Sequence, residues 1–232
     1  MPPFRPSRCY GRGSYSLDPP IMRVFRWLAL AAPLLFAVPA QAHPHVWVSM
    51  KSEVVYDGHG MATAVRHVWS FDDGFSASAL LGVDHKKQGK YTREELAPLA
   101  ALNVETMKDY DYFTIAHADG KPADFKAPVD YWLDYTDGVL TLHFTLPLAA
   151  PVKAKALQVE MYDPSWFVDF SFAEKEPARL VGAPASCKLA VARPGEGPAP
   201  AQSRLGEAFF QNLAPGSNFG EQFSSKMTVT CP

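Results

Sequence analysis

The sequence predicts a mainly β (α+β) fold: an antiparallel β-sandwich-like body with a helical, EF-hand-shaped insertion after the second strand. Three observations lead to this prediction. Many short segments alternate apolar and polar residues, with the period of two typical of half-buried strands. Asp-Gly and related turn sequences separate several of these segments. One region after the second segment has helical spacing and good helix formers instead.

The first 42 residues are predicted to be a signal peptide with an upstream extension. Residues 22–26 form a short basic start, and residues 27–38 are almost wholly apolar. Ala40-Gln41-Ala42 then supplies the small-x-small pattern of a cleavage site. The apolar run is shorter than the roughly 20 residues that a bilayer span needs. We therefore expect a secreted, periplasmic protein without a membrane span, and interpret residues 1–21 as a long n-region or an upstream start.

Trimming the leader changes the charge of the chain. The whole sequence has 22 basic and 24 acidic residues, and its first 42 residues hold five of the basic and one of the acidic ones. The remainder therefore has 17 basic against 23 acidic residues, a net charge of −6. An acidic chain argues against a nucleic-acid or anionic-lipid partner and suits one that attracts cations.

The strand pattern starts directly after the leader. Residues 45–56 alternate as a half-buried strand, and Asp-Gly-His-Gly at 57–60 reads as a hairpin turn. Residues 61–72 should then pair antiparallel with the first strand, and a helical insertion should follow at about 73–110. The later segments expected to form strands are "YFTIAHA", "VDYWLDYT", "GVLTLHFTL", "ALQVEMYD", "WFVDFSFA", "CKLAVARP" and "KMTVTC".

The mature chain is expected to form one domain. Residues 43–193 make the β-rich body, and residues 194–203 are a Pro/Gly/Ala-rich linker. Residues 204–232 add a C-terminal helix and a closing strand packed on the same domain. Two cysteines remain after cleavage, Cys187 and Cys231, and in an oxidising compartment an even pair predicts a disulfide.

The expected mature N-terminus is the first candidate metal site. His43 would offer its α-amine and its imidazole to one ion, and His45 could add a second imidazole. Such nitrogen donors suit copper, nickel, cobalt or zinc better than calcium or magnesium. Pro44 has no backbone N–H, so this motif needs ligands from elsewhere. A polar N-terminal tail with incidental histidines is an equally weighted alternative.

Three further polar residues lie within otherwise apolar strands or at strand ends, and they are the candidates for those extra ligands: His67, Asp72 and Asp163. A histidine on the apolar face of a strand is more often a hydrogen-bonded core residue than a ligand. For His67 the core interpretation therefore carries more weight.

The second candidate site resembles the twelve-residue calcium loop of an EF-hand. The residues at its first, sixth, ninth and twelfth positions are Asp84, Gly89, Thr92 and Glu95. Thr92 and Glu95 also fit a capping box at the start of a helix. Lys86 and Gln88 stand where carboxylates or Asn belong, so two ligand charges are missing. We expect a degenerate loop that has lost calcium binding at physiological levels.

Catalytic signatures are absent from the sequence. No G-x-S-x-G, H-E-x-x-H or P-loop pattern occurs, and neither mature cysteine resembles a nucleophile paired with a base. The expectation is therefore a protein that is not an enzyme.

Six segments together resemble one bacterial family, the domain-of-unknown-function family one thousand and seven. They are "AHPHVWV", "WSFDDGFSA", "GKYTREEL", "YDYFT", "VEMYDPSWFVDF" and a terminal "VTCP". Family members are described as periplasmic components of an uncharacterised ABC-type transport system, often encoded beside nickel/cobalt permeases. The resemblance implies a metal-handling role with an inner-membrane permease as partner and His43 and His45 as ligands, with Asp72 and Asp163 as further positions.

Two alternatives stay open beside an accessory protein of a nickel/cobalt or zinc permease. Periplasmic copper-resistance β-sandwich proteins also begin with histidine, so a copper-binding protein with an N-terminal histidine brace is the first. An interaction domain without a metal is the second. A two-lobed substrate-binding protein is disfavoured, because the chain lacks a βαβ rhythm.

Overall fold

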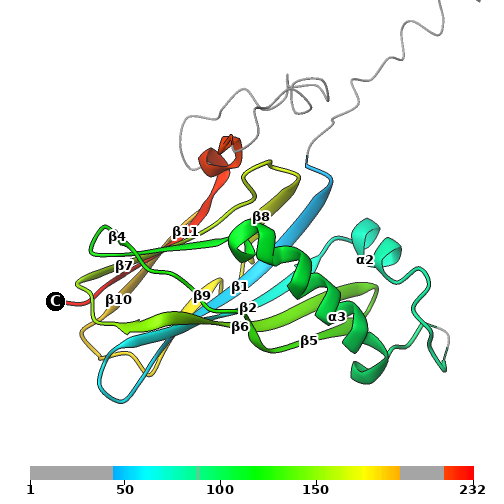
Figure 1. Cartoon of the computed structure of the whole chain (residues 1–232), viewed down its shortest axis with the longest axis horizontal. Helices are drawn as coiled ribbons and strands as arrows, with labels where there is room; N and C mark the ends of the chain where they lie inside the picture. Colours follow the sequence, from blue (N-terminus) through cyan, green and yellow to red (C-terminus); the bar gives the residue numbers. More distant parts are fainter. Residues whose placement is uncertain (1–43, 88, 194–216) are drawn as a thin grey trace, which may run out of the picture. The chain divides into compact units, whose positions relative to one another are not determined.

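The structure is a computed structural model that describes residues 44–87, 89–193 and 217–232. These residues belong to one compact unit, 41–232. The described part is mainly β, and its strands form two sheets, which confirms the prediction of a mainly β protein (Figure 1). Residues 1–43, 88 and 194–216 lie outside the described residues. They include the predicted leader 1–42, His43, the predicted linker 194–203 and most of the segment predicted to form a helix after it.

The first sheet has the strand order β5-β6-β2-β1-β8, and β9 also pairs with β1. Its strands are β1 (Val46–Tyr56), β2 (Ala62–Phe71), β5 (Val129–Thr136), β6 (Val139–Val152), β8 (Val168–Phe172) and β9 (Ala178–Val181). The β1–β2 hairpin forms as the Asp-Gly turn predicts, with Met50 opposite Trp69. The backbone N–H groups of His59 and Met61 both donate to Asp57 Oδ1 at 2.9 Å, which fixes this turn.

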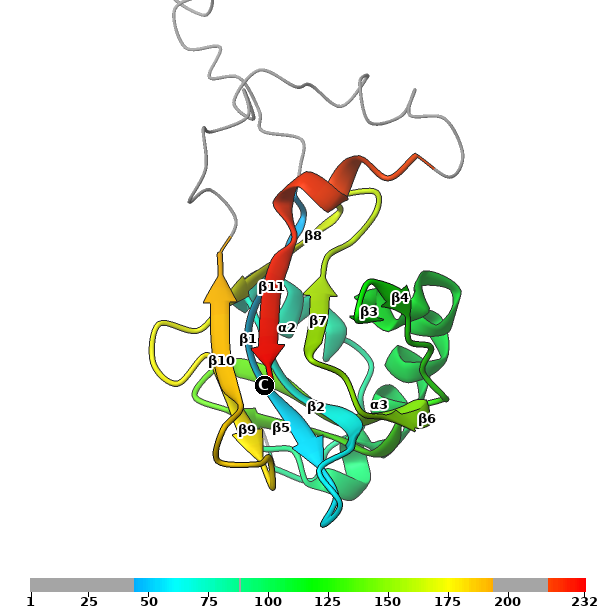
Figure 2. The same cartoon turned by 90° about the vertical axis from the view of Figure 1, so that its left-hand side faces the viewer.

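The second sheet has the order β10-β11-β7-β3-β4, and Figure 2 shows β10, β11 and β7 side by side. Its strands are β3 (Thr114–Ala118), β4 (Lys121–Pro122), β7 (Ala156–Met161), β10 (Lys188–Ala192) and β11 (Ser225–Thr230). The last strand is therefore interior, between β7 and β10. The predicted disulfide between Cys187 and Cys231 is confirmed, and it joins the start of β10 to the residue after β11.

The expectation of an antiparallel body is wrong at one edge of the first sheet. Both β8 and β9 run parallel to β1, with Val46 opposite Val168 and Val54 opposite Leu180. Parallel neighbours need a long crossover connection, and the chain supplies it by passing through the second sheet between β1 and β8. Periodicity alone reveals a strand and its faces but not its partner, which is why the antiparallel arrangement was expected throughout.

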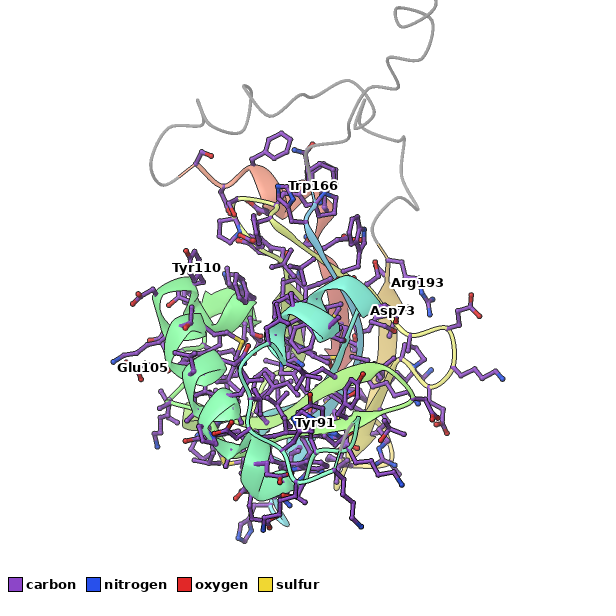
Figure 3. All side chains as sticks on the ribbon, turned by 90° about the vertical axis from the view of Figure 1, so that its right-hand side faces the viewer. Asp73, Tyr91, Glu105, Tyr110, Trp166 and Arg193 are labelled. Atoms are coloured by element: carbon purple, nitrogen blue, oxygen red, sulfur yellow. A yellow bond between two sulfur atoms is a disulfide. The ribbon has the colours of Figure 1, made fainter. Side chains whose placement is uncertain are left out.

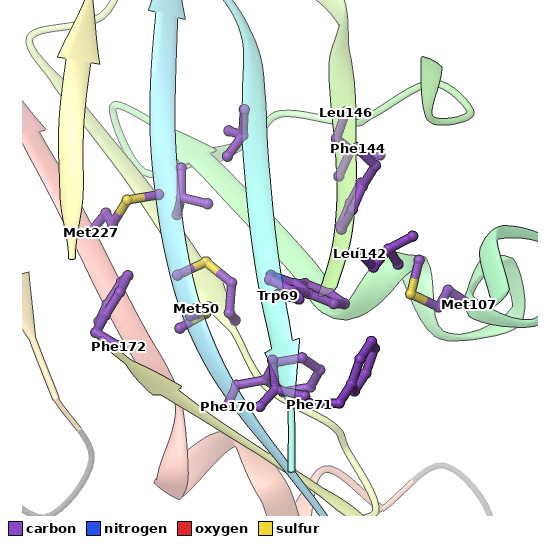
Figure 4. Packing of buried hydrophobic residues seen from close by; sticks show 14 of the residues in the cluster. Met50, Trp69, Phe71, Met107, Leu142, Phe144, Leu146, Phe170, Phe172 and Met227 are labelled. Atoms are coloured by element: carbon purple, nitrogen blue, oxygen red, sulfur yellow. The ribbon is translucent and has the colours of Figure 1, made fainter. Parts of the chain in front are cut away.

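Both sheets supply side chains to a single hydrophobic cluster. Met50, Trp69 and Phe144 come from the first sheet and Met227 comes from the second (Figure 4). The residues of β1 alternate strictly from Val46 to Met50, so that every second side chain is buried. Fully burying one large apolar side chain contributes about 1.5–3 kcal/mol, so this cluster is the main source of stability.

Two helices lie between β2 and β3, at the place predicted for the insertion. They are α2 (Asp73–Ala79) and α3 (Arg93–Met107), and a 3₁₀ segment η2 (Lys108–Phe113) follows. The helix α3 lies along the β5 side of the first sheet in Figure 1, and its Leu96 and Met107 belong to the hydrophobic cluster. Among the described residues, no helix has the length and apolar character required to cross a bilayer.

The chain between α3 and β3 adopts an unusual backbone. Asp111, Tyr112 and Phe113 all have positive φ, at 50°, 53° and 51°. Left-handed backbone costs a non-glycine residue about 1–2 kcal/mol. The Phe113 ring packs against the rings of Trp69 and Phe170, and these contacts act against that cost.

Candidate functional site

The candidate site lies at the start of β1. His45 directly precedes this strand, and the backbone N–H groups of His45 and Val46 donate to the carbonyl oxygen of Phe167 at 2.9 and 3.2 Å. The imidazole of His45 is exposed, and its centroid lies 4.8 Å from that of the Phe167 ring. Side chains alternate along a strand, so His45 shares the outer face of the sheet with Trp47 and Ser49. His43, the other predicted histidine ligand, lies outside the described residues.

Asp72 lies beside the same end of β1, but backbone groups hold its carboxylate. Its Oδ2 accepts a hydrogen bond from Trp47 N–H at 2.9 Å. Its Oδ1 accepts one from Phe75 N–H at 2.9 Å, which makes Asp72 the N-cap of α2. Asp72 thus ties β1, β2 and α2 together close to His45.

Asp163 also lies near this end, in the loop between β7 and β8, and it is buried. Its Oδ1 accepts from the backbone N–H and the hydroxyl of Ser165, both at 2.8 Å. Its Oδ2 accepts from the N–H groups of Phe167 and Val168, at 3.1 and 3.0 Å. These four hydrogen bonds to the carboxylate fix the conformation of the loop that places Phe167 beside His45.

A short C-terminal segment covers this loop. The 3₁₀ helix η4 (Phe219–Phe223) places Phe223 in a stack on Trp166, with centroids 4.4 Å apart. Trp166 lies beside η4 in Figure 3. A Cβ at Gly220 would come within 1.7 Å of the carbonyl oxygen of Asp163, so only glycine fits this approach. The loop next to His45 is thus held from both sides.

The structure places His67 away from the other candidates. His67 is opposite Ser52, seven residues along β1 from His45, which at about 3.3 Å per residue is a separation of more than roughly 20 Å. Its ring is fully buried against Trp69 and Phe144. Burial lowers the pKa of His67 from 6.5 to about 3, so the ring is neutral at physiological pH.

Both ring nitrogens of His67 have partners. The Nδ1 atom lies 2.9 Å from Ser52 Oγ, and Nε2 lies 3.4 Å from Thr114 Oγ1. The Thr114 hydroxyl donates its own hydrogen to the carbonyl oxygen of Tyr112 at 3.0 Å. It can then only accept from His67, so we assign the hydrogen to Nε2 and Nδ1 accepts from Ser52. His67 is a hydrogen-bonded core residue in this arrangement, as expected for a histidine on the apolar face of a strand.

Sequence reasoning missed one polar residue of the site, Asp169 in β8. Asp169 is opposite Trp47 in the parallel β1–β8 register, so it lies on the outer face that His45 occupies. It is half-buried, and burial raises the pKa of its carboxyl group, although a hydrogen bond from Ser171 acts in the opposite direction. The alternation in "VDFSF" already marks Asp169 as outward-facing. Its closeness to His45 depends on a strand pairing that periodicity does not reveal.

The loop with calcium-loop spacing lies between α2 and α3. Gly89 has the positive φ, 68°, that its place at the turn predicts. The predicted capping box is present: Thr92 Oγ1 accepts from Glu95 N–H, and Glu95 Oε2 accepts from Thr92 N–H. The other oxygen of Glu95 accepts from Lys86 N–H at 3.0 Å. These backbone donors lower the pKa of Glu95, and its carboxylate joins the third position of the loop to the ninth.

Metal ligands do not converge within the described residues alone. No group of three or more His, Cys, Asp or Glu side chains suited to a metal ion occurs in residues 44–87, 89–193 and 217–232. Within these ranges, His45 and Asp169 lie on the same face of the first sheet, at the neighbouring strands β1 and β8. The donor types, an exposed imidazole and a half-buried carboxylate, fit a transition metal such as zinc, nickel or cobalt.

Comparison with protein families gives a match over most of the chain. The model of the family described as "Protein of unknown function (DUF1007)" matches residues 28–231, which is nearly the whole chain. No curated protein matches the sequence. The match includes β1 with His45, the α2–α3 region, the loop around Asp163 and the closing strand β11. The chain therefore belongs to the DUF1007 family.

Proposed function

We propose that this chain is a periplasmic transition-metal-binding accessory protein that works with an inner-membrane nickel/cobalt or zinc permease. The observation that carries the proposal is the position of His45. Its exposed imidazole lies at the start of β1, two residues after His43, on a stretch of backbone fixed by Phe167 and Asp72. A chelating N-terminal histidine would thus enter the fold beside a second imidazole.

The rigidity of the His45 backbone supports this role. A metal site gains affinity when its ligands are held in place before binding. The loop that carries Phe167 is shaped by the four donors to Asp163 and covered by η4, so the surroundings of His45 are fixed by the protein core. A flexible histidine tail would have no such support.

Metal titration of the mature protein tests the proposal. The protein is produced through its own leader, its N-terminus is determined, and Zn²⁺, Ni²⁺ and Co²⁺ binding is measured by calorimetry. We expect His43→Ala and His45→Ala each to weaken binding by at least roughly tenfold, because each removes a nitrogen ligand. The matched control is His59→Ala, which removes an exposed histidine from the β1–β2 turn. Equal affinities for all four proteins would contradict the proposal.

The permease association needs a cellular measurement. In the native host, replacing the gene by the His45→Ala variant should lower the accumulation of zinc, nickel or cobalt as much as deleting the gene does. The His59→Ala variant should restore normal accumulation. If deletion leaves all three metal contents unchanged, the transport role is wrong.

A copper site is the alternative within metal binding. Any site of nitrogen and oxygen donors binds Cu²⁺ more tightly than zinc, nickel or cobalt, so affinity does not separate the alternatives. The metal content of protein purified from the periplasm does. We expect zinc, nickel or cobalt, and copper at one ion per chain would favour a histidine brace instead.

One observation favours the interaction domain as a second candidate function. The two large aromatic side chains nearest to His45 on the outer face are exposed, Trp47 at 50% and Phe167 at 46%. Exposed aromatic residues are common at protein interfaces. Replacing Trp47 by Ser should leave metal affinity unchanged under the metal proposal and should disturb function in cells only if this face binds a partner.

The finer fold assignment is part of the same proposal. We infer a sandwich-like body, because the two sheets share one hydrophobic cluster and His67 of the first sheet contacts Thr114 of the second. We also infer that the loop from Asp84 to Glu95 is a degenerate EF-hand loop. The capping box and the positive φ of Gly89 support this origin.

A further inference from the structure

Among the acidic side chains near His45, Asp169 differs in what holds it. The carboxylates of Asp72 and Asp163 accept hydrogen bonds from backbone N–H groups at both oxygens. The carboxylate of Asp169 accepts a hydrogen bond from the Ser171 hydroxyl, at 3.3 Å, and no backbone donor is bonded to it within the described residues. Asp169 thus has acceptor capacity left for a ligand.

Within the part of the chain that the structure describes, the charge of Asp169 also has no counter-ion. No Lys, Arg or His side chain forms an ion pair with it among the residues that the structure describes. Glu53, in β1 of the same sheet, shows the usual arrangement, since Arg66 and Arg179 both pair with it. A half-buried carboxylate without a cation is costly unless it binds one, because removal from water penalises the charged form.

The register of β1 and β8 gives Asp169 a histidine neighbour. Trp47 lies opposite Asp169, and His45 comes two residues before Trp47 on the same face. Neighbouring strands lie about 4.8 Å apart and rise about 3.3 Å per residue, so residues in this diagonal relation are about 8 Å apart. An imidazole and a carboxylate at these two positions would share an ion that lies about 2 Å from each ligand atom.

We propose that Asp169 is a direct carboxylate ligand of the metal ion bound at the start of β1, shared with the imidazole of His45. This inference rests on the proposed function and adds the ligand that distinguishes the site from an all-nitrogen brace. An imidazole and carboxylate set suits Zn²⁺, Ni²⁺ or Co²⁺ and is poorly matched to Cu⁺, which selects sulfur ligands. The site would therefore be built from two strands that the fold joins in parallel.

The test uses the mature full-length chain and the metal ions alone. Calorimetry with Zn²⁺ and Ni²⁺ compares the wild type with Asp169→Asn, which removes the charge and keeps the shape. The matched control is Asp130→Asn, an exposed acid with a positive φ that Asn tolerates, in β5 at the opposite edge of the same sheet. We expect at least a roughly tenfold loss of affinity for Asp169→Asn and no loss for the control.

A second pair of measurements keeps the proposal testable if Asp169→Asn folds poorly. Asp169→His replaces one ligand by another and should bind more tightly than Asp169→Asn. Crystals of the wild-type protein soaked in zinc should show an anomalous peak between the side chains of His45 and Asp169. A peak elsewhere, or a carboxylate that does not contact the ion, overturns the proposal.

The outcomes separate this inference from the proposed function. Binding that is lost in His45→Ala and retained in Asp169→Asn leaves the metal function in place and removes Asp169 as a ligand. A wild-type protein that binds none of the metals removes both. Equal losses in Asp169→Asn and Asp130→Asn would reveal a general effect of surface charge and would also refute Asp169 as a ligand.

Discussion

The imidazole of His67 joins the two sheets: its Nδ1 lies 2.9 Å from the hydroxyl of Ser52 in β1, while Nε2 faces the hydroxyl of Thr114 in β3. The Thr114 hydroxyl in turn donates a hydrogen bond to the carbonyl oxygen of Tyr112, in the left-handed turn before β3. One buried neutral ring thereby fixes a contact between the sheets and the geometry of a strained turn.

Acid should destabilise the protein through His67. Its pKa is about 3 when folded and 6.5 in the unfolded chain, so between these values the unfolded state binds a proton that the folded state does not. The free energy of unfolding is therefore highest above pH 6.5. It falls as the pH decreases from there toward 3, by on the order of 1 kcal/mol per pH unit. Urea denaturation at pH 7, 6 and 5 measures this slope.

The variant His67→Gln cannot titrate and retains hydrogen-bonding capacity. It should be less stable than the wild type at pH 7 and should lose less stability between pH 7 and 5. His59→Gln, at an exposed turn, should keep the wild-type slope. Identical slopes for the wild type and His67→Gln would mean that the ring is not buried neutral.

Asp163→Asn should cost stability. The amide keeps one acceptor oxygen and brings an NH₂ group toward donors that already point at the carboxylate, from Ser165, Phe167 and Val168. Losing hydrogen bonds to a charged group costs about 1.5–3 kcal/mol each, so a loss of about 2–4 kcal/mol is expected in chemical denaturation. Asp137→Asn, in an exposed turn, is the control. If Asp163 were a metal ligand without this structural role, Asp163→Asn would instead weaken metal binding and leave the stability of the protein unchanged.

Gly220→Ala should displace η4 from the loop beneath it. The new methyl group would overlap the backbone carbonyl of Asp163, which cannot move aside as a flexible side chain could. We expect the free energy of unfolding to fall by about 1–3 kcal/mol. The near-ultraviolet circular dichroism should also change, because Phe223 would leave its stack on Trp166. Gly58→Ala meets open space and is the matched control. Similar stabilities of the two variants would show that η4 does not pack closely against the loop.

Calcium binding should be recoverable at the degenerate loop. The double variant Lys86→Asp, Gln88→Asp removes an ammonium group and supplies the two missing carboxylates, and affinity follows the number of ligand charges. We expect no binding by the wild type at about 1 mM Ca²⁺ and measurable binding by the double variant, followed by calorimetry.

A triple variant that adds Glu95→Gln gives the control for this experiment. It replaces the carboxylate at the twelfth position by an amide. In the double variant, that carboxylate would have to leave the N–H groups of Lys86 and Thr92 to bind an ion. Binding by the double variant that survives Glu95→Gln would place the ion outside the loop. Calcium binding by the wild type would contradict the degenerate assignment.

The sequence predicted those parts of the fold that depend on local chemistry. The alternation from Val46 to Met50, the turn at Asp57 and the capping box of Thr92 and Glu95 each involve neighbours within a few residues. The parallel strands β8 and β9 could not be predicted in the same way. Val168 and Leu180 have the pattern of any half-buried strand, and only the folded chain brings them to β1.

The same distinction applies to the site. His45 was recognisable because its partner candidate, His43, is two residues away in the sequence. Asp169 was not recognisable as a candidate, because only the β1–β8 pairing brings it to the same region as His45. Asp163 and Asp72 have the residue type of a metal ligand, but the backbone donors around them became visible only in three dimensions.

The parallel edge of β1 has a consequence for how the chain folds as it is made. Val46 pairs with Val168 and Val54 with Leu180, so this edge has no partner until more than a hundred further residues have been synthesised. At synthesis rates of about 5–20 residues per second, that interval lasts roughly 6 to 25 seconds. An unpaired strand edge is a template for aggregation, and such distant pairings also slow folding. The emerging chain should therefore depend on chaperones until β8 and β9 arrive, and its yield should fall when those chaperones are depleted.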